Sequence, residues 1–518
     1  MKINKSTQEI AFFDILYPYL KEFLESLKPF NHLSSSLKDK LSLVLLKKLS
    51  AVAERSLQHE LDDYIKNSTN EELELSKFND QIKHKLKSNY PVLDNFLTSV
   101  VSNFTSHITN ITTRFLNDQN TLSEFLNLPN QKLEIIDIVV DLGDDHFGQN
   151  TTLLKLSSGN KLIYKPRNIN VTKSYNNFIK WINRKLEIDI KTFEFIDRQD
   201  YGWLEFVPYK ESNSVNELKD YYFKAGVLLA TSYILGSKDY HHENIIASGK
   251  DPMIIDHETI VQPTITNAIS QNSFEGNLNI TSPSVLESHL ITVPGTNLPL
   301  GVAGFGSISN TSLTDVKKEV INPNTLESKR VTRFYSSSMI KKNVPIHNNK
   351  HVFMNDYASE FINGFENAYD LFSTSKKDLK SSSSPIQEFS NKEVRFVWRP
   401  THVYIKILNY LRSEKYMSDE EKYKSKAYEL LSKAYKHESM SKYEFIFQSE
   451  LEQLLKGDIP LFNLTSTDHF LYNSKNRQRI FDTNCIENIH NRIDSLSPDN
   501  KQQQLDIINN SIHSKSIA

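Results

Sequence analysis

The residues best suited to chemistry lie between positions 239 and 258. Asp239, His241 and Asn244 form the pattern D-x-H-x-x-N, and Asp256 follows twelve positions after Asn244. A carboxylate can orient or deprotonate an attacking hydroxyl, and amide and carboxylate oxygens are ligands that Mg²⁺ accepts beside phosphate oxygens. These residue types in this order predict phosphoryl transfer, in which Asp239 acts on the hydroxyl while Asn244 and Asp256 bind the metal.

The segments on both sides of this pattern are suited to hold it in place. Residues 225–235 are apolar over a length that predicts a buried helix, and the short apolar run 253–255 predicts a strand that ends at Asp256. A helix, a polar loop and a strand that delivers a carboxylate make up the catalytic loop and metal site of kinases.

A β-rich region precedes the helix. Residues 133–141, 151–156 and 161–167 predict three strands, and a hairpin turn separates the last two. In a kinase N-lobe a strand lysine pairs with the nucleotide phosphates, so Lys165 is the candidate ligand for ATP. The interval up to Asp239 has room for a helix and two more strands, which we expect at 178–186, 193–196 and 202–207.

The turn at 142–148 contains Gly143, His146 and Gly148, which are candidates for covering the nucleotide phosphates. Each of these residues also has an ordinary interpretation. Two glycines can simply form a turn, a histidine in a loop is often only polar, and a strand lysine such as Lys165 is often a solvated edge residue. The residue types alone leave both interpretations open.

A metallohydrolase site is a competing interpretation of the same region. His241, His242 and Glu243 could bind a metal together with the acidic and imidazole side chains at 256–258. Adjacent residues on a helix or strand do not converge on one ion, which disfavours this alternative. The sequence order Lys165, Asp239, Asn244, Asp256 instead matches the order of roles in a kinase.

Taken together, the motifs resemble the dehydratase domain of class II lanthipeptide synthetases (LanM type). The resemblance covers residues 130 to 465. It is carried by Y-K-P-R at 164–167, the turn at 143–148, the D-x-H-x-x-N pattern with Asp256-x-Glu258, R-x-x-x-R-P-T-x-x-Y at 395–404 and G-D-I-P-x-F at 457–462.

The resemblance implies a reaction in two steps. Members of that family phosphorylate Ser and Thr of a precursor peptide with ATP and Mg²⁺, and then eliminate phosphate to leave dehydroalanine or dehydrobutyrine. It implies that Lys165 binds ATP, that Asp239 acts on the hydroxyl with His241 beside it, and that Asn244 and Asp256 bind Mg²⁺. Glu258 is expected either to assist elimination or to brace its loop.

Elimination needs groups that neutralise the departing phosphate. A guanidinium can bind two phosphate oxygens and a hydroxyl adds a donor, and the resemblance assigns these roles to Arg395 and Thr401. Arg399 lies one helical turn or two strand steps from Arg395, so in either geometry both side chains can face one pocket. The alternative is an ordinary basic segment with both arginines on a solvated face.

The resemblance also implies the fold class, which is α+β. We expect a lipid-kinase-like bilobal core with a small β-rich N-lobe, a mainly helical C-lobe and added helical regions. The predicted segments are a helical N-terminal region at 1–130, the N-lobe at 131–215, the C-lobe with activation-like and elimination segments at 216–465, and a helical, polar tail at 466–518. Within them we expect an exposed linker at 376–385 and a frayed end over roughly the last fifteen residues.

Composition narrows the class of protein further. The chain has 518 residues, a formal net charge of −2 and 24% charged residues, so a soluble protein is expected and nucleic acid is not indicated as a partner. No apolar run is long enough to insert in a membrane. The single cysteine, Cys485, predicts a reducing cytoplasm and cannot supply the Cys and His zinc site of a LanC-like cyclase. We therefore expect a dehydratase half standing alone.

Three functions remain open on the sequence. The first is the dehydratase, with a leader-bearing precursor peptide as substrate and a separate cyclase or transporter as a further candidate partner. The second is a kinase for a peptide or small molecule without elimination, which the presence of Arg395 and Thr401 disfavours. The third is a non-catalytic module that binds a leader peptide, which the presence of Lys165, Asp239 and Asn244 disfavours.

Overall fold

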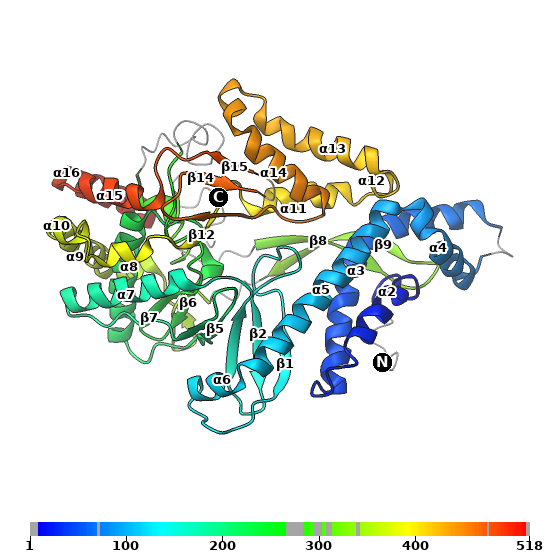
Figure 1. The fold of residues 1–518 in the computed structure, drawn as a ribbon, viewed down its shortest axis with the longest axis horizontal. Coiled ribbons are helices and arrows are strands. Elements are labelled where there is room, and N and C mark those ends of the chain that lie inside the picture. The colour runs from blue at the N-terminus through cyan, green and yellow to red at the C-terminus, as the bar shows by residue number, and fades with distance from the viewer. Residues whose placement is uncertain are drawn as a thin grey trace. The chain divides into compact units, whose positions relative to one another are not determined.

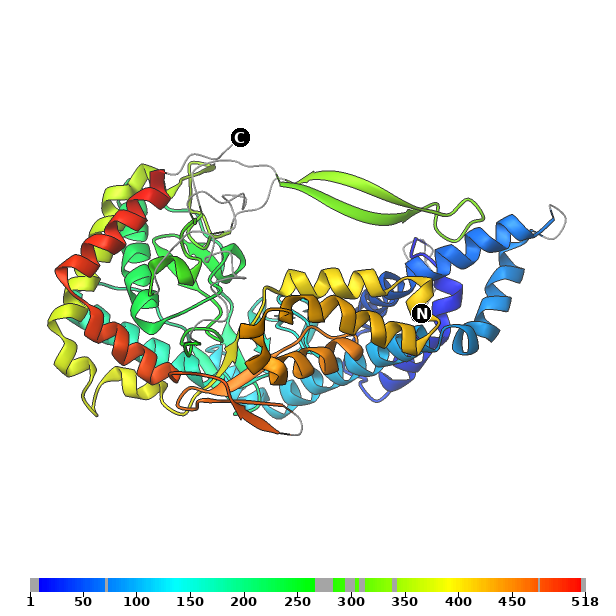
Figure 2. The ribbon, with the colours of Figure 1, turned by 90° about the horizontal axis from the view of Figure 1, so that it is seen from above.

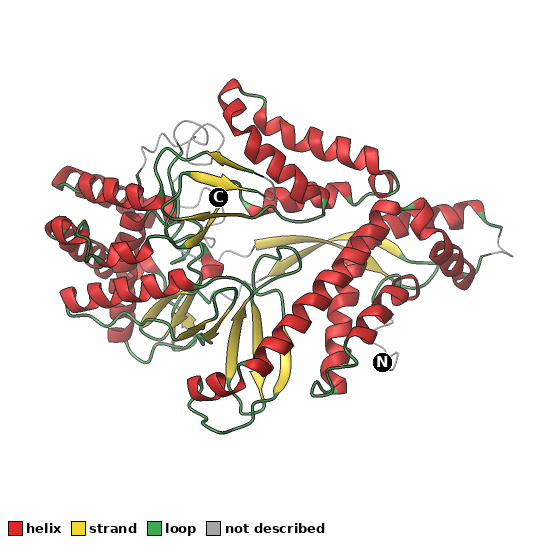
Figure 3. Ribbon diagram, in the orientation of Figure 1, coloured by secondary structure: helices red, strands yellow, loops and turns green. Residues whose placement is uncertain are grey.

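The computed structural model describes residues 9–69, 73–265, 283–293, 303–306, 313–337, 342–473 and 476–513. By its internal contacts the chain divides into two compact units. Unit 1 comprises Met1–Pro166, Asp315–Tyr335 and Arg399–Pro460, and unit 2 comprises Arg167–Thr314, Ser336–Trp398 and Leu461–Ala518. Both contain helices and strands (Figure 3), which confirms the α+β class. The lipid-kinase-like bilobal arrangement and the sequence-based segment boundaries stay predictions.

Unit 1 begins with a group of helices, as the sequence predicts for the described part of 1–130. They are α2 (Phe13–Ser26), α3 (Ser35–Asn67), α4 (Leu75–Asn89), α5 (Pro91–Asn117) and α6 (Gln119–Phe125). The hydroxyl of Ser34 caps α3 by accepting from the backbone N–H of Leu37, and Pro91 occupies the first turn of α5, where no donor is lost. Their apolar stripes face one another and form the core of this region.

An antiparallel meander follows in unit 1. It consists of β1 (Ile135–Val139), β2 (Thr152–Leu156) and β3 (Lys161–Lys165), and Figure 1 shows β1 and β2 beside α5 and α6. The register pairs Ile138 with Leu154, and Leu154 with Leu162. These three side chains are buried, so alternation places them on one face. All three predicted strands are confirmed.

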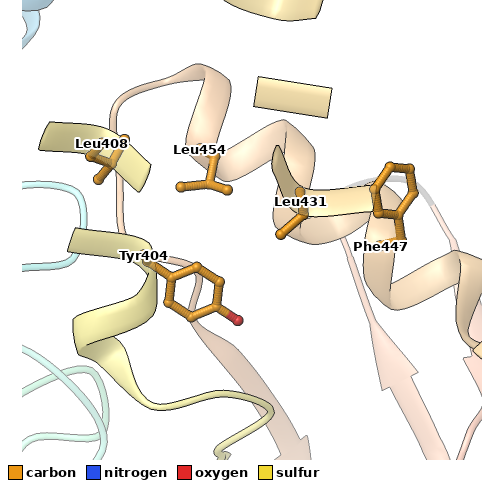
Figure 4. Packing of buried hydrophobic residues seen from close by; sticks show 5 residues of the cluster. All are labelled: Tyr404, Leu408, Leu431, Phe447 and Leu454. Carbon is orange, nitrogen blue, oxygen red and sulfur yellow. The ribbon is translucent and has the colours of Figure 1, made fainter. Parts of the chain in front are cut away.

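The last part of unit 1 is helical. It contains α11 (Thr401–Leu411), α12 (Glu414–Met417), α13 (Glu420–Ser432) and α14 (Glu444–Leu455). Figure 4 shows their buried contact, in which Tyr404 and Leu408 of α11 face Leu431 of α13 and Phe447 and Leu454 of α14. This cluster fixes the orientation of α11, whose first residue is Thr401.

Unit 1 also contains a long two-stranded ribbon, which contacts helix α3. Figure 2 shows it as β8 (Leu313–Ile321) and β9 (Lys329–Ser337). The Gln58 amide of α3 donates to the carbonyl of Ser328 at 2.8 Å, and Arg330 pairs with Glu54 at 2.9 Å. These contacts attach the ribbon's turn to α3.

Unit 2 is built around two closely packed helices, α8 (Val215–Leu235) and α9 (Ala358–Thr374). A Cβ atom on Gly226 would overlap the carbonyl of Phe361, and one on Gly364 would overlap the carbonyl of Phe223. The two glycines therefore permit a backbone approach that any other residue would block. Around this pair lie α7 (Asn170–Leu186) and the hairpins β4 (Phe195–Asp197) with β5 (Gly202–Glu205) and β6 (Ile245–Ser248) with β7 (Asp251–Ile254).

The remaining elements of unit 2 come from the second half of the chain. They are β10 (Ile346–His347), β11 (Lys350–His351), α10 (Lys376–Leu379), β12 (Glu393–Phe396), β13 (Phe462–Thr465), β14 (Phe470–Tyr472), β15 (Arg477–Arg479), α15 (Cys485–Ser495) and α16 (Pro498–His513). Strand β12 pairs with β13, and α16 packs on α9 (Figure 2). None of the helices in the described parts of the chain is both long and apolar enough to cross a membrane.

Two sequence-based expectations for this region are wrong. The Ser-rich stretch at 376–385 is not an exposed linker, because it contains α10 and leads into a 3-10 turn, and Leu379 and Ile386 are buried. The C-terminal residues up to His513 are not frayed, because Ile508 and Ile512 bury one face of α16. Both stretches are mostly polar, and their few apolar residues fall at helical spacing.

Candidate functional site

The predicted site residues fall in both units. Unit 2 holds Asp239, His241, Asn244, Asp256, Glu258 and Arg395, and unit 1 holds Gly143, His146, Gly148, Lys165, Arg399 and Thr401. The two groups are described separately below.

The loop that carries Asp239 is fixed from both ends. Helix α8 ends at Leu235 and is capped by Gly236, whose φ of 69° is the left-handed conformation found after a helix C-terminus. The hydroxyl of Thr259 donates to the carbonyl of Lys238 at 2.6 Å, and the backbone N–H of Tyr240 donates to Ser288 at 2.8 Å. Asp239 itself has a φ of 63°, a strained value for a residue other than glycine. The surrounding contacts therefore hold this carboxylate in a conformation that it would not adopt alone.

Asp239 lies where charge is hard to solvate. Burial raises the pKa of its carboxyl, the charges of His241, Arg395 and His289 oppose that rise, and the charge of Asp256 adds to it. The Nε2 atom of His241 is 3.9 Å from Asp239 Oδ1, beyond hydrogen-bonding distance. A carboxylate with a raised pKa is a stronger base than an exposed one, which suits a group that takes a proton from a hydroxyl.

Asn244 and Asp256 flank the β6–β7 hairpin at the same end. Ile245 pairs with Ile254, and the backbone N–H of Ile255 donates to the carbonyl of Asn244 at 2.9 Å. The Asn244 amide donates to the carbonyl of Asp239 at 2.7 Å, which orients the amide so that its oxygen points away from that bond. The hairpin thus places an amide oxygen and a carboxylate at one edge beside Asp239.

This donor set fits Mg²⁺ bound together with nucleotide phosphates. Mg²⁺ requires oxygen ligands and commonly takes only one or two from the protein, with phosphates and water completing the octahedron. Asn244 and Asp256 supply such oxygens. The competing metallohydrolase site has no support here, since no group of three His, Cys, Asp or Glu side chains in the described residues is placed to hold a metal.

Glu258 is held by a partner that the sequence analysis missed. Arg167 Nη1 lies 2.6 Å from Glu258 Oε2, and both side chains are mostly shielded from solvent. The carbonyl of Glu258 accepts from the backbone N–H of Arg395 at 2.7 Å, and the Gln262 amide donates to the carbonyl of Arg395 at 2.7 Å. Backbone contacts therefore fix Arg395 beside Glu258, which supports a bracing role for Glu258.

His289 is a further residue that the sequence analysis missed. It follows the 3-10 helix η3 (Val285–Ser288), has a φ of 60°, and part of its side chain reaches solvent. Desolvation by the surrounding protein lowers the pKa of the imidazole, while the charge of Asp239 opposes that fall. The carbonyl of His289 accepts from the backbone N–H of Gly304 at 2.9 Å. No local pattern marks His289, because only the tertiary fold brings it near Asp239.

The C-terminal helix α15 braces three segments of this site. Arg492, which is buried, pairs with Glu287 at 2.7 Å and donates to the carbonyl of Tyr233 at 2.8 Å. Asn488 donates to the carbonyl of Gln262 at 2.8 Å. Although burial opposes ionisation, the charge of Arg492 holds the pKa of Glu287 at about 2. Helix α15 thus contacts the end of α8, the segment after Glu258 and the loop that leads to His289.

In unit 1, Lys165 is buried in β3 with 6% of its surface exposed. Its neighbour Tyr164 is also buried, and its hydroxyl accepts from Arg114 Nη1 at 2.5 Å. The solvated-edge interpretation of Lys165 is therefore wrong. Burying an ammonium group is costly unless anionic or hydrogen-bonding partners compensate it, and such a group is suited to binding phosphate.

The turn with Gly143, His146 and Gly148 is tied to the protein. The backbone N–H of Phe147 donates to Asp458 Oδ1 at 2.9 Å, and His146 Nδ1 lies 3.0 Å from the carbonyl of Ile459. A Cβ atom on Gly148 would overlap Asn103 of α5, and its φ is 71°, whereas Gly143 has open space around it. Packing thus accounts for Gly148, and the N–H of Phe147 is already engaged by the protein.

Thr401 and Arg399 have different surroundings. The hydroxyl of Thr401 donates to Asp144 Oδ2 at 2.9 Å, which joins the start of α11 to the 143–148 turn. Arg399 Nε pairs at 2.6 Å with Glu450, which is fully buried and also accepts from the hydroxyl of Tyr404 at 2.6 Å. One buried guanidinium nitrogen of Arg399, Nη2, has no hydrogen-bond partner among the described residues. Arg399 is therefore committed mainly to a structural ion pair.

The spacing argument that joined Arg395 and Arg399 is wrong. Strand β12 ends at Phe396 and α11 begins at Thr401, so Arg399 lies in the connecting segment. Neither a helical turn nor two strand steps separate the arginines. Pro400 explains the break, since a proline disfavours helical geometry at the residue before it.

Comparison with known proteins gives the family. Residues 90–465 match a family model described as a domain of unknown function (DUF4135). The chain belongs to this family. It is also 26% identical over 454 residues to the lacticin 481/lactococcin biosynthesis protein LcnDR2 of Lactococcus lactis subsp. lactis, a match that covers 83% of this chain and 47% of the relative. The expected relationship to lanthipeptide synthetases of the LanM type is thereby confirmed, and the chain spans about half the length of that relative.

Proposed function

We propose that this protein is a lanthipeptide-type dehydratase. It phosphorylates Ser and Thr of a ribosomal precursor peptide with ATP and Mg²⁺, and then eliminates phosphate to leave dehydroalanine or dehydrobutyrine. The observation that carries the proposal is the conformation of Asp239, a half-buried carboxylate on a strained backbone that is hydrogen-bonded to Asn244. The relationship to a lacticin 481/lactococcin biosynthesis protein supplies the substrate class.

In the phosphorylation step, Asp239 accepts the proton of the substrate hydroxyl. The raised pKa of Asp239 makes it basic enough for this, and His241 adds positive charge near it once protonated. Asn244 and Asp256 would hold Mg²⁺ and Lys165 the nucleotide. The metal ion supplies charge neutralisation of the phosphates when it is bound. Glu258 and Arg167 keep the segment after Asp256 in place.

In the elimination step, the peptide loses a Cα proton and the bond between Cβ and the phosphate oxygen breaks. The departing phosphate dianion must be stabilised, and a guanidinium does this with two parallel hydrogen bonds. We assign this role to Arg395, whose backbone is fixed by Glu258 and Gln262, and we keep Thr401 as a second donor. Arg399 acts by holding α11 through Glu450.

A kinase without elimination is the second candidate function. The observation that favours it is that the hydroxyl of Thr401 is bonded to Asp144, so a phosphate would have to compete for it. We also propose a separate cyclase or a transporter as a partner, and only the relationship to lanthipeptide synthetases supports this.

Mass spectrometry of the precursor peptide encoded beside the gene tests the proposal. The peptide is incubated with the protein, ATP and Mg²⁺. A loss of about 18 Da per modified residue supports dehydration, and a gain of about 80 Da supports the kinase alternative. The variant Asp239→Ala is the control and should give neither change. An unchanged peptide mass with the unaltered protein would contradict both functions.

A further inference from the structure

Unit 1 contains a cavity of about 290 Å³ whose wall includes Gly148 and none of the other candidate site residues described above. It lies between α3, α5 and α11, and the 145–148 turn and residues 456–459 close its remaining sides. Val52, Phe96, Val100, Phe104 and Leu408 give it apolar walls. A volume of this size accommodates a large side chain with part of its backbone.

The basic side chains that line this cavity differ in whether they form ion pairs. Lys48 contacts Asp141 at 2.7 Å and Asp145 at 3.0 Å, and Lys456 contacts Glu452 at 3.1 Å. Arg412, at the end of α11, forms no ion pair with any residue that the structure describes, and its guanidinium donates to the side chain of Asn409 at 3.1 Å. Burial lowers the pKa of this guanidinium, while the charges of Tyr423 and Glu54 oppose that fall.

A half-buried guanidinium without a carboxylate in contact is costly, and the nearby charge of Glu54, which pairs with Arg330, compensates it only in part. A ligand that brings an anion to Arg412 recovers this cost, and its apolar part can displace water from Phe96 and Phe104. The cavity therefore has the chemistry to bind a group that is apolar at one end and carries a carboxylate beside it.

We propose that this cavity binds a segment of the precursor peptide in which a bulky apolar residue stands next to an acidic one. The proposal rests on the proposed function, which supplies a peptide partner. The apolar side chain packs against Phe96 and Phe104, and the carboxylate pairs with Arg412. The exposed Ile405, with 42% of its surface open at the rim of the cavity, extends the apolar surface along α11 for the rest of a polypeptide.

Occupation of the cavity also touches the 143–148 turn. Asp145 and Gly148 contribute to its wall, and so does Asp458, whose carboxylate holds the backbone of Phe147. The bound segment thus contacts a turn that is hydrogen-bonded to Thr401 through Asp144. This segment is distinct from the Ser or Thr residue that reacts, so binding at the cavity tethers the peptide while its residues are modified in turn.

Fluorescence anisotropy with the full chain tests the proposal without ATP. Overlapping segments of the precursor peptide encoded beside the gene, each about fifteen residues long and labelled with fluorescein, are titrated with protein. One segment with adjacent apolar and acidic residues should bind. Arg412→Glu should weaken its binding at least about tenfold, and changing the acidic residue of the peptide to lysine should restore binding to that variant.

Matched variants separate the cavity from general effects. Ser99→Trp fills the cavity and should prevent binding, whereas Ser102→Trp on the same helix is exposed, does not line the cavity and should not. Lys85→Glu, exposed on α4, controls for the change in net charge. Thermal unfolding of each variant shows that it is folded before binding is compared.

Three results would overturn the proposal. One is unchanged binding to both Arg412→Glu and Ser99→Trp, and another is the absence of any segment that binds. In the third result, octanoate binds to the unaltered protein but not to Arg412→Glu, and no peptide segment displaces it. The ligand of the cavity would then be a small carboxylic acid and not a peptide. The mass of the peptide after incubation with ATP and Mg²⁺ is measured in parallel. If the peptide is dehydrated while its binding is unchanged in Arg412→Glu, the docking proposal fails and the proposed function stands.

Discussion

Arg492 of α15 forms an ion pair of 2.7 Å with Glu287, the residue two positions before His289. The family model ends at residue 465, so α15 lies outside the matched region. A helix beyond the family's shared region therefore supports the loop that runs against Tyr240 and carries an imidazole near Asp239.

Replacing Arg492 with methionine should destabilise unit 2. The substitution leaves Glu287 as a buried carboxylate without its counter-ion, and breaking a buried pair from one side costs roughly 3–5 kcal/mol. The free energy of unfolding can be measured in urea. The double variant with Glu287→Met should recover much of the loss, because it removes the stranded charge. An unchanged urea midpoint in the single variant would show that the pair is not buried as described.

Replacing Arg395 with alanine should separate the two proposed steps. The backbone of Arg395 is held through its own N–H and carbonyl, so the substitution removes the guanidinium and leaves the strand in place. Phosphorylation continues and the phosphopeptide accumulates, seen as a mass gain of about 80 Da. Elimination should slow by about 100-fold or more. Arg395→Lys keeps the charge without the planar guanidinium, so its elimination rate should lie between those of the unaltered protein and Arg395→Ala. Unmodified peptide from the alanine variant is the result that contradicts this division of roles.

Asp458 should make stability depend on pH. Burial raises the pKa of its carboxyl to about 6, with the charge of Asp145 adding to the rise. The folded protein then binds more protons than the unfolded chain between about pH 4 and 6, so its free energy of unfolding falls as pH rises through that window. Asp458→Asn keeps an acceptor for Phe147 and removes this dependence. At pH 7 it should be more stable than the unaltered protein by up to about 3 kcal/mol, and the difference should vanish near pH 3.

Thermal unfolding across this pH range measures the effect of Asp458→Asn. Asp80→Asn, on the exposed side of α4, is the matched control, because it makes the same chemical change at the surface. The difference in stability between Asp458→Asn and the unaltered protein should change with pH. If it does not, the pKa of the Asp458 carboxyl is the same in the folded and the unfolded protein.

The two glycines of the 143–148 turn should respond differently to alanine. Gly148 has a positive φ and packs against Asn103, so Gly148→Ala should lower the free energy of unfolding by about 1–3 kcal/mol. Gly143→Ala meets open space and should leave stability nearly unchanged. Equilibrium unfolding compares both variants. If Gly143→Ala lowers only the affinity for ATP while remaining stable, the turn approaches the nucleotide at Gly143.

Local patterns were enough to predict several of the helices and strands around the candidate site. The strands around Lys165, the helix before Asp239 and the strand that leads to Asp256 were predicted from spacing and β-branched content, because these elements depend on neighbouring residues, whereas β6, the other strand of that hairpin, was not predicted. The 376–385 stretch was misjudged because serine and lysine suggested a linker, whereas Leu379 and Ile386 bury it.

Contacts between distant residues could not be predicted in this way. Glu287 and Arg492 are 205 positions apart and His289 is an isolated histidine in the sequence, so neither carries a local signal. The ion pair between Arg399 and Glu450 also carries no local signal in the sequence. It gives Arg399 a structural role, whereas the motif had suggested a role in catalysis. Residue types indicate which chemistry is possible, while the fold decides which charges are already neutralised.

Unit 1 is assembled from three separated stretches of the chain, and this has a consequence for its synthesis. Residues up to 166 emerge from the ribosome long before Arg399–Pro460, which contribute α11 to α14. Until then the apolar sides of α3 and α5 lack part of their covering, and such surfaces favour aggregation. A fragment cut at residue 90, where the family match begins, would lose α2, α3 and α4 and expose the buried side of α5. We therefore expect the N-terminal helices to be needed for folding even though they contribute none of the residues assigned to catalysis.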